Sequence, residues 1–269
     1  MKTGTLTLLS ALTLVLSALL LSGARTAATV KDRVPRASAA ATQSQKRVYE
    51  RASYTESVYG TISFHGKVPE RRMIDMAADP VCDEINRSPQ TGDVIVTDGK
   101  LANVFVYVKT ERALEEFSFE APSQSAVLEH KKCQYVPHAL GIQVGQTLSV
   151  VNGDPTTHNT NVQTIINRPW NVSQPPGGEP ILKQFSLAEM FIPFKDNQHP
   201  WEKAWVGVFA HPFFAVSKRD GSYRIDGLPP GSYTLVAWHE KYGEQQIAIA
   251  VAQGEQKTQD FIFESHDGR

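Results

Sequence analysis

The sequence predicts an all-β protein, and three observations support this prediction. Short runs alternate apolar and polar side chains, as residues 59–64 do, which is typical of half-buried strands. Turn signals such as Asp98-Gly99 and Asp220-Gly221 separate these runs. No stretch keeps the apolar period of 3.6 residues that a long helix requires. The pattern therefore favours sandwiches of short strands.

The strands are expected in a definite order. After residues 59–64, a hairpin is expected at 93–97 and 101–109, with its turn at Asp98-Gly99. The later apolar runs predict strands at 127–135, 141–144, 147–151, 159–163, 182–187, 190–194, 204–209, 247–251 and 258–263. Residues 167–179 contain three prolines and two adjacent glycines, so a long irregular loop is expected there.

The first 57 residues carry the signs of export. Lys2 precedes an apolar run at residues 6–21, and the small residues Ser22 and Ala24 fit a cleavage site, so residues 1–24 are expected to be a signal peptide. The apolar run is shorter than the roughly 20 residues that span a bilayer, although an uncleaved anchor is the alternative. Residues 25–57 are rich in Ala, Ser, Thr and charge, and are expected to form a disordered leader. The expected location is periplasmic or secreted, with no membrane span after cleavage.

Composition narrows the classes of function. The net charge is −1 over 269 residues, which argues against nucleic acid or an anionic membrane as a partner. The two cysteines, Cys82 and Cys133, predict a disulfide in an exported chain; the alternative is that one supplies a metal thiolate. No nucleophile elbow, phosphate-binding loop or His-Glu-x-x-His motif is present, so an enzyme is not expected.

One stretch carries the residue types of a metal site. Asp196, His199 and Glu202 follow one another at x2 spacing between two apolar runs. About forty residues upstream, His158 follows the apolar run 148–151. Imidazoles and carboxylates bind Zn²⁺, Cu²⁺ and similar ions, so these four residues are the predicted metal ligands at one pole of a sandwich. The alternative is a site without metal, in which the acids are solvated.

The remaining histidines carry weaker signals. His65, His130 and His266 have no motif around them. His138, His211 and His239 each lie at a strand end beside Pro or Trp, and we interpret them as packed at an interface rather than as ligands.

The two metal-type segments resemble a known family. Residues 137–159 resemble the first half of a cupredoxin, or blue copper, domain, and residues 194–202 resemble its ligand loop. That loop normally reads Cys-x2-His-x2-Met, whereas this chain has Asp196 and Glu202 at the sulfur positions. The resemblance implies a Greek-key β-sandwich over residues 113–210. It also implies copper or another divalent metal in a non-blue site, since a blue site needs a thiolate and a thioether.

A second resemblance lies in the carboxyl-terminal part. The pattern Asp220-Gly-x-Tyr-x-Ile-x-Gly-Leu-Pro-Pro-Gly-x-Tyr-Thr-Leu235 resembles carboxypeptidase regulatory-like domains, which are transthyretin-like β-sandwiches. This resemblance implies a sandwich over residues 211–265 whose first strands are at 58–112. The cupredoxin-like part is then either inserted into this sandwich or arranged in tandem with it. Residues 59–263 as a whole resemble exported proteins of the methylamine-utilisation-protein-like group.

These resemblances imply an exported cupredoxin-like protein. The expected function is metal binding, or that of a redox-silent relative of a copper electron carrier. Two alternatives stay open: a non-catalytic envelope module that recognises a protein or carbohydrate, and residual electron transfer. The expected partner is accordingly an envelope protein or a redox partner.

Overall fold

The computed structural model describes residues 46–109 and 112–265, and these fall in one unit, Ser44–Arg269. The expected signal peptide (1–24) and most of the expected leader (25–45) lie outside the described residues. Within the described part of the chain, no helix has the length and apolar character needed to cross a membrane.

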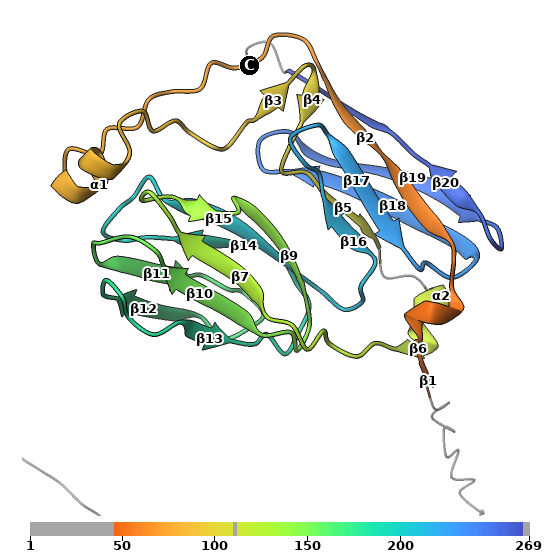
Figure 1. Cartoon of the computed structure of the whole chain (residues 1–269). Coiled ribbons are helices and arrows are strands. Elements are labelled where there is room, and N and C mark those ends of the chain that lie inside the picture. The colour runs from red at the N-terminus through yellow and green to blue at the C-terminus, as the bar shows by residue number, and fades with distance from the viewer. Residues whose placement is uncertain (1–45, 110–111, 266–269) are drawn as a thin grey trace, which may run out of the picture. The chain divides into compact units, whose positions relative to one another are not determined.

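The first sandwich consists of two sheets (Figure 1). One has the strand order β13-β10-β7-β8 and the other β12-β11-β14-β15-β9. Between the sheets lie fully buried side chains such as Leu128, Val150 and Phe194, each stabilising the fold by roughly 1.5–3 kcal/mol. The strands are β7 (Ala126–His130), β8 (Tyr135–Val136), β9 (Ala139–Gln143), β10 (Leu148–Asn152), β11 (His158–Val162), β12 (Trp170–Gln174), β13 (Ile181–Lys183), β14 (Glu189–Lys195) and β15 (Lys203–Phe209).

The second sandwich has its own core, which includes Ile62, Leu101 and Leu235. Its first sheet has the order β16-β5-β18-β19, and the second has the order β17-β2-β4-β3, with β20 and β21 also paired to β2. The strands are β2 (Ser57–His65), β3 (Val96–Thr97), β4 (Lys100–Leu101), β5 (Phe105–Val108), β16 (Phe214–Val216), β17 (Ser222–Asp226), β18 (Gly231–His239), β19 (Gly243–Val251), β20 (Gln256–Thr258) and β21 (Phe261–Glu264). The all-β fold class is confirmed.

Strand pairing shows how the two sandwiches follow one another along the chain. The pairs β5–β16 and β5–β18 join a strand that precedes the first sandwich to strands that follow it. The strands of the first sandwich therefore lie, in sequence, between neighbouring strands of the second.

An aromatic cluster joins the two sandwiches. Phe191 stacks on Trp238 with ring centroids 3.7 Å apart, and Phe105 lies 5.4 Å from Phe191. Gly141 allows this close approach, because a Cβ atom there would lie 2.6 Å from the ring of Phe214. The junction is thus a packed apolar contact.

Several local expectations are corrected. The leader was expected to be disordered to residue 57, but β1 (Arg47–Val48) pairs with β6 (Phe117–Ser118) and a 3-10 turn follows at η1 (Arg51–Ser53). The reason is packing, since the Tyr49 ring contacts Phe117, Phe119 and Phe213. The expected irregular loop at 167–179 contains β12, and two short helices were missed, α1 (Pro80–Ile85) and α2 (Arg112–Glu115).

Candidate metal centre

The structure brings the four predicted ligands together at the end of the first sandwich. His158 Nδ1 lies 3.0 Å from Asp196 Oδ2, 3.0 Å from His199 Nδ1 and 3.1 Å from Glu202 Oε1. His199 Nδ1 lies 3.2 Å from Asp196 Oδ2. All four side chains are buried. His158 opens β11, whereas the other three lie in the turn between β14 and β15.

The x2 spacing brings the three side chains together because hydrogen bonds within residues 196–202 fix the conformation of this turn. Asp196 Oδ1 accepts hydrogen bonds from the backbone N–H groups of Gln198 (2.6 Å) and His199 (3.0 Å). Glu202 N donates to the His199 carbonyl at 2.8 Å. The second carboxylate oxygen of Asp196 accepts from Asn159 N at 2.9 Å, which ties the turn to β11. Asp196 is therefore fixed with Oδ2 facing both imidazoles.

Two further carboxylates set the tautomers of the imidazoles. His158 Nε2 lies 3.1 Å from Asp154 Oδ2, and His199 Nε2 lies 2.9 Å from Asp79 Oδ2. A carboxylate only accepts, so each Nε2 carries a proton, and in the neutral form of each imidazole Nδ1 presents its lone pair. Two lone pairs and two carboxylate oxygens then face one another at about hydrogen-bond distance. These four electron-rich atoms repel one another unless a cation or protons lie between them.

His130 belongs to the centre, although it showed no sequence context. Its Nδ1 lies 2.7 Å from Glu202 Oε2, and its Nε2 lies 3.1 Å from Thr160 Oγ1. This contact leaves Glu202 Oε1 facing His158, where it is buried without a hydrogen-bond partner among the described residues. The alternation of side chains along a strand could have predicted that His130 is buried, since His130 lies on the same face of β7 as the buried Leu128.

The carboxylates behind the imidazoles are linked by the disulfide. Asp79 caps α1 by accepting from Val81 N and Cys82 N, at 2.8 and 3.3 Å. Asp154 accepts from Cys133 N at 2.7 Å. The predicted bond between Cys82 and Cys133 is present and confirmed. It therefore joins the two backbone segments that hold the outer carboxylates, and α1 lies beside this end of the first sandwich (Figure 1).

The electrostatics of the centre favour a cation. Burial alone would lower the pKa of His158, but its hydrogen bonds to Asp154 and Asp196 raise that pKa to about 9. Burial likewise opposes ionisation of Asp196, yet hydrogen bonds from both imidazoles hold its pKa well below the usual range. Four carboxylates and three imidazoles share this buried volume, so neutral imidazoles leave an excess of negative charge.

The donor set indicates which ions fit. Two imidazole nitrogens and two carboxylate oxygens suit Zn²⁺ or Cu²⁺. Bonds of about 2.0 Å to a tetrahedral ion place the ligand atoms about 3.3 Å apart, close to the distances observed here. Both cysteines of the chain form the disulfide, so neither offers the thiolate of a blue copper site.

The three histidines that we interpreted as interface residues are not part of the metal centre. Among the described residues, no cluster of potential ligands includes His138, His211 or His239. His138 Nε2 contacts Glu240, whereas His211 and His239 are buried in separate positions.

Comparisons with known proteins give one family model and several solved structures. A family model, the carboxypeptidase regulatory-like domain, matches residues 196–264. No curated protein matches the chain.

Solved structures of cupredoxins resemble the chain weakly. A purple cupredoxin from Nitrosopumilus maritimus is 21% identical, covering 31% of this chain and 98% of its own, with a TM-score of 0.27. Amicyanin from Paracoccus versutus is 20% identical, covering 38% and 96%, with a TM-score of 0.27. A copper-containing nitrite reductase from Thermus scotoductus is 18% identical and matches 38% of this chain but 27% of its own length, with a TM-score of 0.30.

Proposed function

We propose that this protein binds one divalent metal ion through His158 Nδ1, His199 Nδ1, Asp196 Oδ2 and Glu202 Oε1. The observation that carries the proposal is the convergence of these atoms, with Glu202 Oε1 buried and otherwise unpartnered. A buried carboxylate oxygen without a partner costs free energy, and a metal ion removes that cost.

The arrangement supports metal capture or a structural ion rather than catalysis. All four proposed ligands come from side chains that are at most 3% exposed. Catalytic zinc sites keep one position open for water or substrate, whereas structural sites have four protein ligands. When bound, the ion supplies positive charge among the carboxylates, and the chain's own residues hold it by fixing four donors from two segments.

The chemical contrast with blue copper proteins is part of this proposal. Asp196 and Glu202 are proposed to stand where a cupredoxin has its cysteine and methionine ligands. Hard oxygen donors favour Cu²⁺ over Cu⁺, which soft sulfur ligands select, so rapid redox cycling is disfavoured. Membership of the methylamine-utilisation-protein-like group is proposed on the sequence resemblance of residues 59–263. The disulfide supports export to an oxidising compartment, periplasmic or extracellular.

The first test is metal titration. Protein stripped with a chelator is titrated with Zn²⁺ and with Cu²⁺, and the bound metal is measured by elemental analysis. One equivalent is expected, with only a pale colour for Cu²⁺. The double variant His158→Ala, His199→Ala is expected to lose this binding, whereas His65→Ala, an exposed histidine on β2, keeps it. Wild-type protein that retains no ion refutes the proposal.

A second experiment tests the ligand positions. The double variant Asp196→Cys, Glu202→Met puts a thiolate and a thioether beside two imidazole Nδ1 atoms. An intense visible absorption band is expected when Cu²⁺ binds, because thiolate-to-copper charge transfer becomes available. A variant that binds copper without that band shows that residue 196 does not face the metal.

A further inference from the structure

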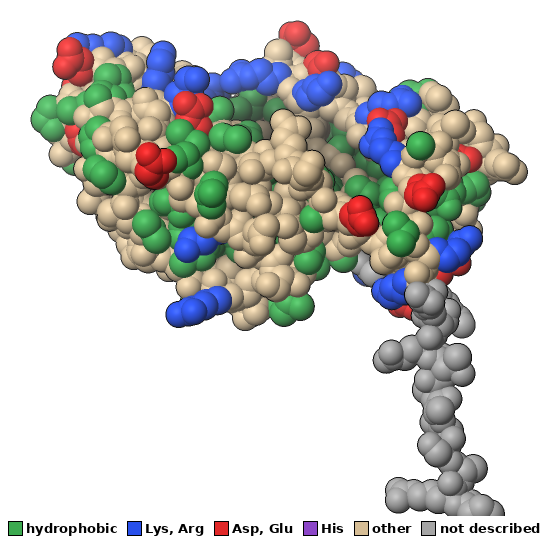
Figure 2. Space-filling view, turned by 60° about the horizontal axis from the view of Figure 1, so that its bottom comes forward, with side chains coloured by type: hydrophobic (Ala, Val, Ile, Leu, Met, Phe, Trp, Pro, Cys, Tyr) green, Lys and Arg blue, Asp and Glu red, His purple; other side chains and the backbone are tan. Residues whose placement is uncertain are grey.

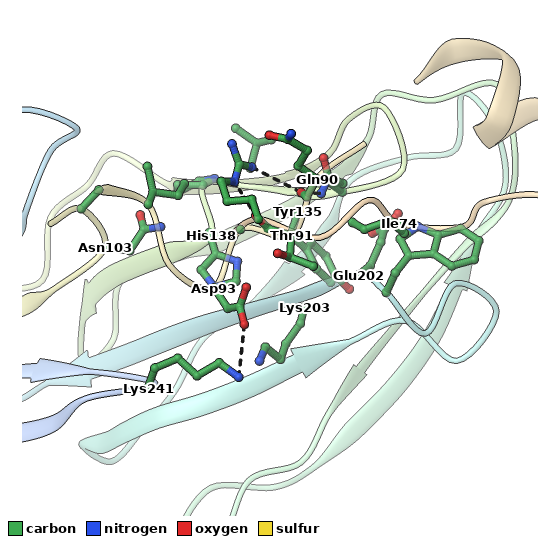
Figure 3. Close-up of a pocket in the computed structure, with 18 of the residues that line it drawn as sticks. Ile74, Gln90, Thr91, Asp93, Asn103, Tyr135, His138, Glu202, Lys203 and Lys241 are labelled. Carbon is green, nitrogen blue, oxygen red and sulfur yellow. Dashed lines mark hydrogen bonds and ion pairs between the residues drawn. The ribbon is translucent and has the colours of Figure 1, made fainter. Parts of the chain in front are cut away.

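A cleft of about 580 Å³ lies beside the metal centre and is bordered by both sandwiches (Figure 3). One wall includes Tyr135, His138 and Trp201 of the first sandwich and its loops. The lining also includes Asn103 and Lys241 of the second sandwich. The volume lies within the range of 300–1,000 Å³ that is typical of small-molecule sites.

The lining of this cleft is strongly cationic. It contains six basic side chains and two acidic ones, the acids being Asp93 and Glu202 and the bases Arg71, Arg72, Lys203, Lys218, Arg219 and Lys241. The chain as a whole has a net charge of −1, so this excess is local. On the face drawn in Figure 2, Lys and Arg side chains gather along the upper edge of the view.

The chain's own acids neutralise only part of this charge. Lys203 pairs with Glu240 at 2.6 Å, and Lys241 pairs with Asp93 at 3.2 Å. Arg71 donates to backbone carbonyl groups of Thr91 and Gln90 rather than to an acid. Among the described residues, no ion pair involves the other three bases, Arg72, Lys218 and Arg219. A cationic concave surface of this kind concentrates anions.

The cleft also offers apolar surface. Ile74, Val136 and Trp201 contribute apolar area to its lining. An organic group attached to the anion can therefore be buried against these side chains.

We propose that this cleft binds a small organic anion that bears a carboxylate or phosphate group on an apolar body. The anionic group pairs with the unneutralised bases, including Arg72 and Arg219, and the apolar body lies against Trp201. This inference goes beyond the proposed metal site and does not depend on it, since no basic residue named here is a proposed metal ligand. The two sites are neighbours, because Glu202 also borders the cleft and the Trp201 ring lies 5.2 Å from that of His199.

Phenyl phosphate is a suitable probe, because it combines an anionic group with an apolar ring. Of the four tryptophans, only Trp201 lines the cleft, so its fluorescence gives a local signal. We expect saturable one-to-one binding by calorimetry with a Kd below about 1 mM and a matching change in fluorescence. The fluorescence change is expected to disappear in Trp201→Phe. The measurement is made with metal-free and metal-loaded protein, so failure of one site is distinguished from failure of the other.

The double variant Arg72→Gln, Arg219→Gln is expected to weaken binding at least about tenfold. The matched control Arg168→Gln, Lys195→Gln removes the same charge from residues outside the cleft lining, and is expected to change the affinity less than about twofold. Equal weakening by both pairs, or no binding of phenyl phosphate, overturns the proposal. Inorganic phosphate that binds as tightly as phenyl phosphate overturns the proposed apolar contact.

Discussion

Replacing Asp79 by asparagine isolates the part that the outer carboxylates play in the metal centre. Asp79 Oδ1 caps α1, while Oδ2 accepts from His199 Nε2 at 2.9 Å and from Thr156 Oγ1 at 2.8 Å. Asparagine is as good an N-cap as aspartate, so its single oxygen can keep the cap. Its amide group then faces the imidazole as a donor.

The consequence for His199 is a change of tautomer. A donor opposite Nε2–H favours the imidazole form with the proton on Nδ1, and that proton blocks the proposed metal bond. Loss of such an outer partner typically weakens metal affinity by about 10- to 100-fold, or about 1.4–2.7 kcal/mol. Asp79→Ser keeps the cap and removes the charge without presenting an amide, so its loss of affinity is expected to be smaller.

The assay is a competition titration of metal-stripped protein against a coloured chelator at fixed ionic strength, with urea unfolding of the metal-free protein in parallel. The metal-free Asp79→Asn protein is expected to lose about 1–3 kcal/mol of stability, because its amide group cannot accept from His199 Nε2 and Thr156 Oγ1, and the unfolding data separate this loss from the change in metal affinity. Asp83→Asn is the matched control, because Asp83 is an exposed residue on the same helix. Equal losses in the Asn and Ser variants refute the tautomer argument, and so does an Asn variant with wild-type affinity.

Two further predictions concern the disulfide and pH. The double variant Cys82→Ser, Cys133→Ser is expected to lose up to about 4 kcal/mol of stability by the chain-entropy estimate for a 51-residue separation. Its metal affinity is expected to fall at least about tenfold in the same competition titration, because the backbone segments that donate to Asp79 and Asp154 are no longer joined. An unchanged affinity contradicts the proposed role of the disulfide in holding the outer carboxylates. Burial lowers the pKa of both His211 and His239 to about 4. Between pH 6.5 and 4 these two residues therefore bind more protons in the unfolded chain than in the folded one, and the free energy of unfolding falls as the pH decreases. The variant His211→Gln, His239→Gln is expected to reduce the slope of unfolding free energy against pH near pH 5 by up to about 2.7 kcal/mol per pH unit; an unchanged slope in urea titrations contradicts this account.

The sequence predicted best those features that are local. The turn at Asp98-Gly99 joins β3 to β4 as expected, because both residues adopt the positive φ angles (50° and 69°) that this pair tolerates. The Asp196-x2-His199-x2-Glu202 turn was likewise recognisable, since its hydrogen bonds close within seven residues. In both places the chemistry needed is contained in one short segment.

The missed features depend on long-range contacts. His130 reaches Glu202 across 72 positions, and Asp79 reaches His199 across 120, so neither position has a local signal. Prolines on both sides of β12 concealed a strand that sits at the edge of its sheet, where proline is tolerated. The ordered end of the expected leader depends on Tyr49 packing against aromatic residues that lie far away in sequence.

X-ray absorption at the metal edge of the Zn²⁺-loaded protein tests the central claim most directly. The proposed ligand set predicts four nitrogen or oxygen scatterers at about 2.0–2.1 Å, with the imidazole contribution of two histidines and no sulfur near 2.3 Å. A spectrum that requires a sulfur ligand, or fewer than two imidazoles, contradicts the ligand set of His158, His199, Asp196 and Glu202.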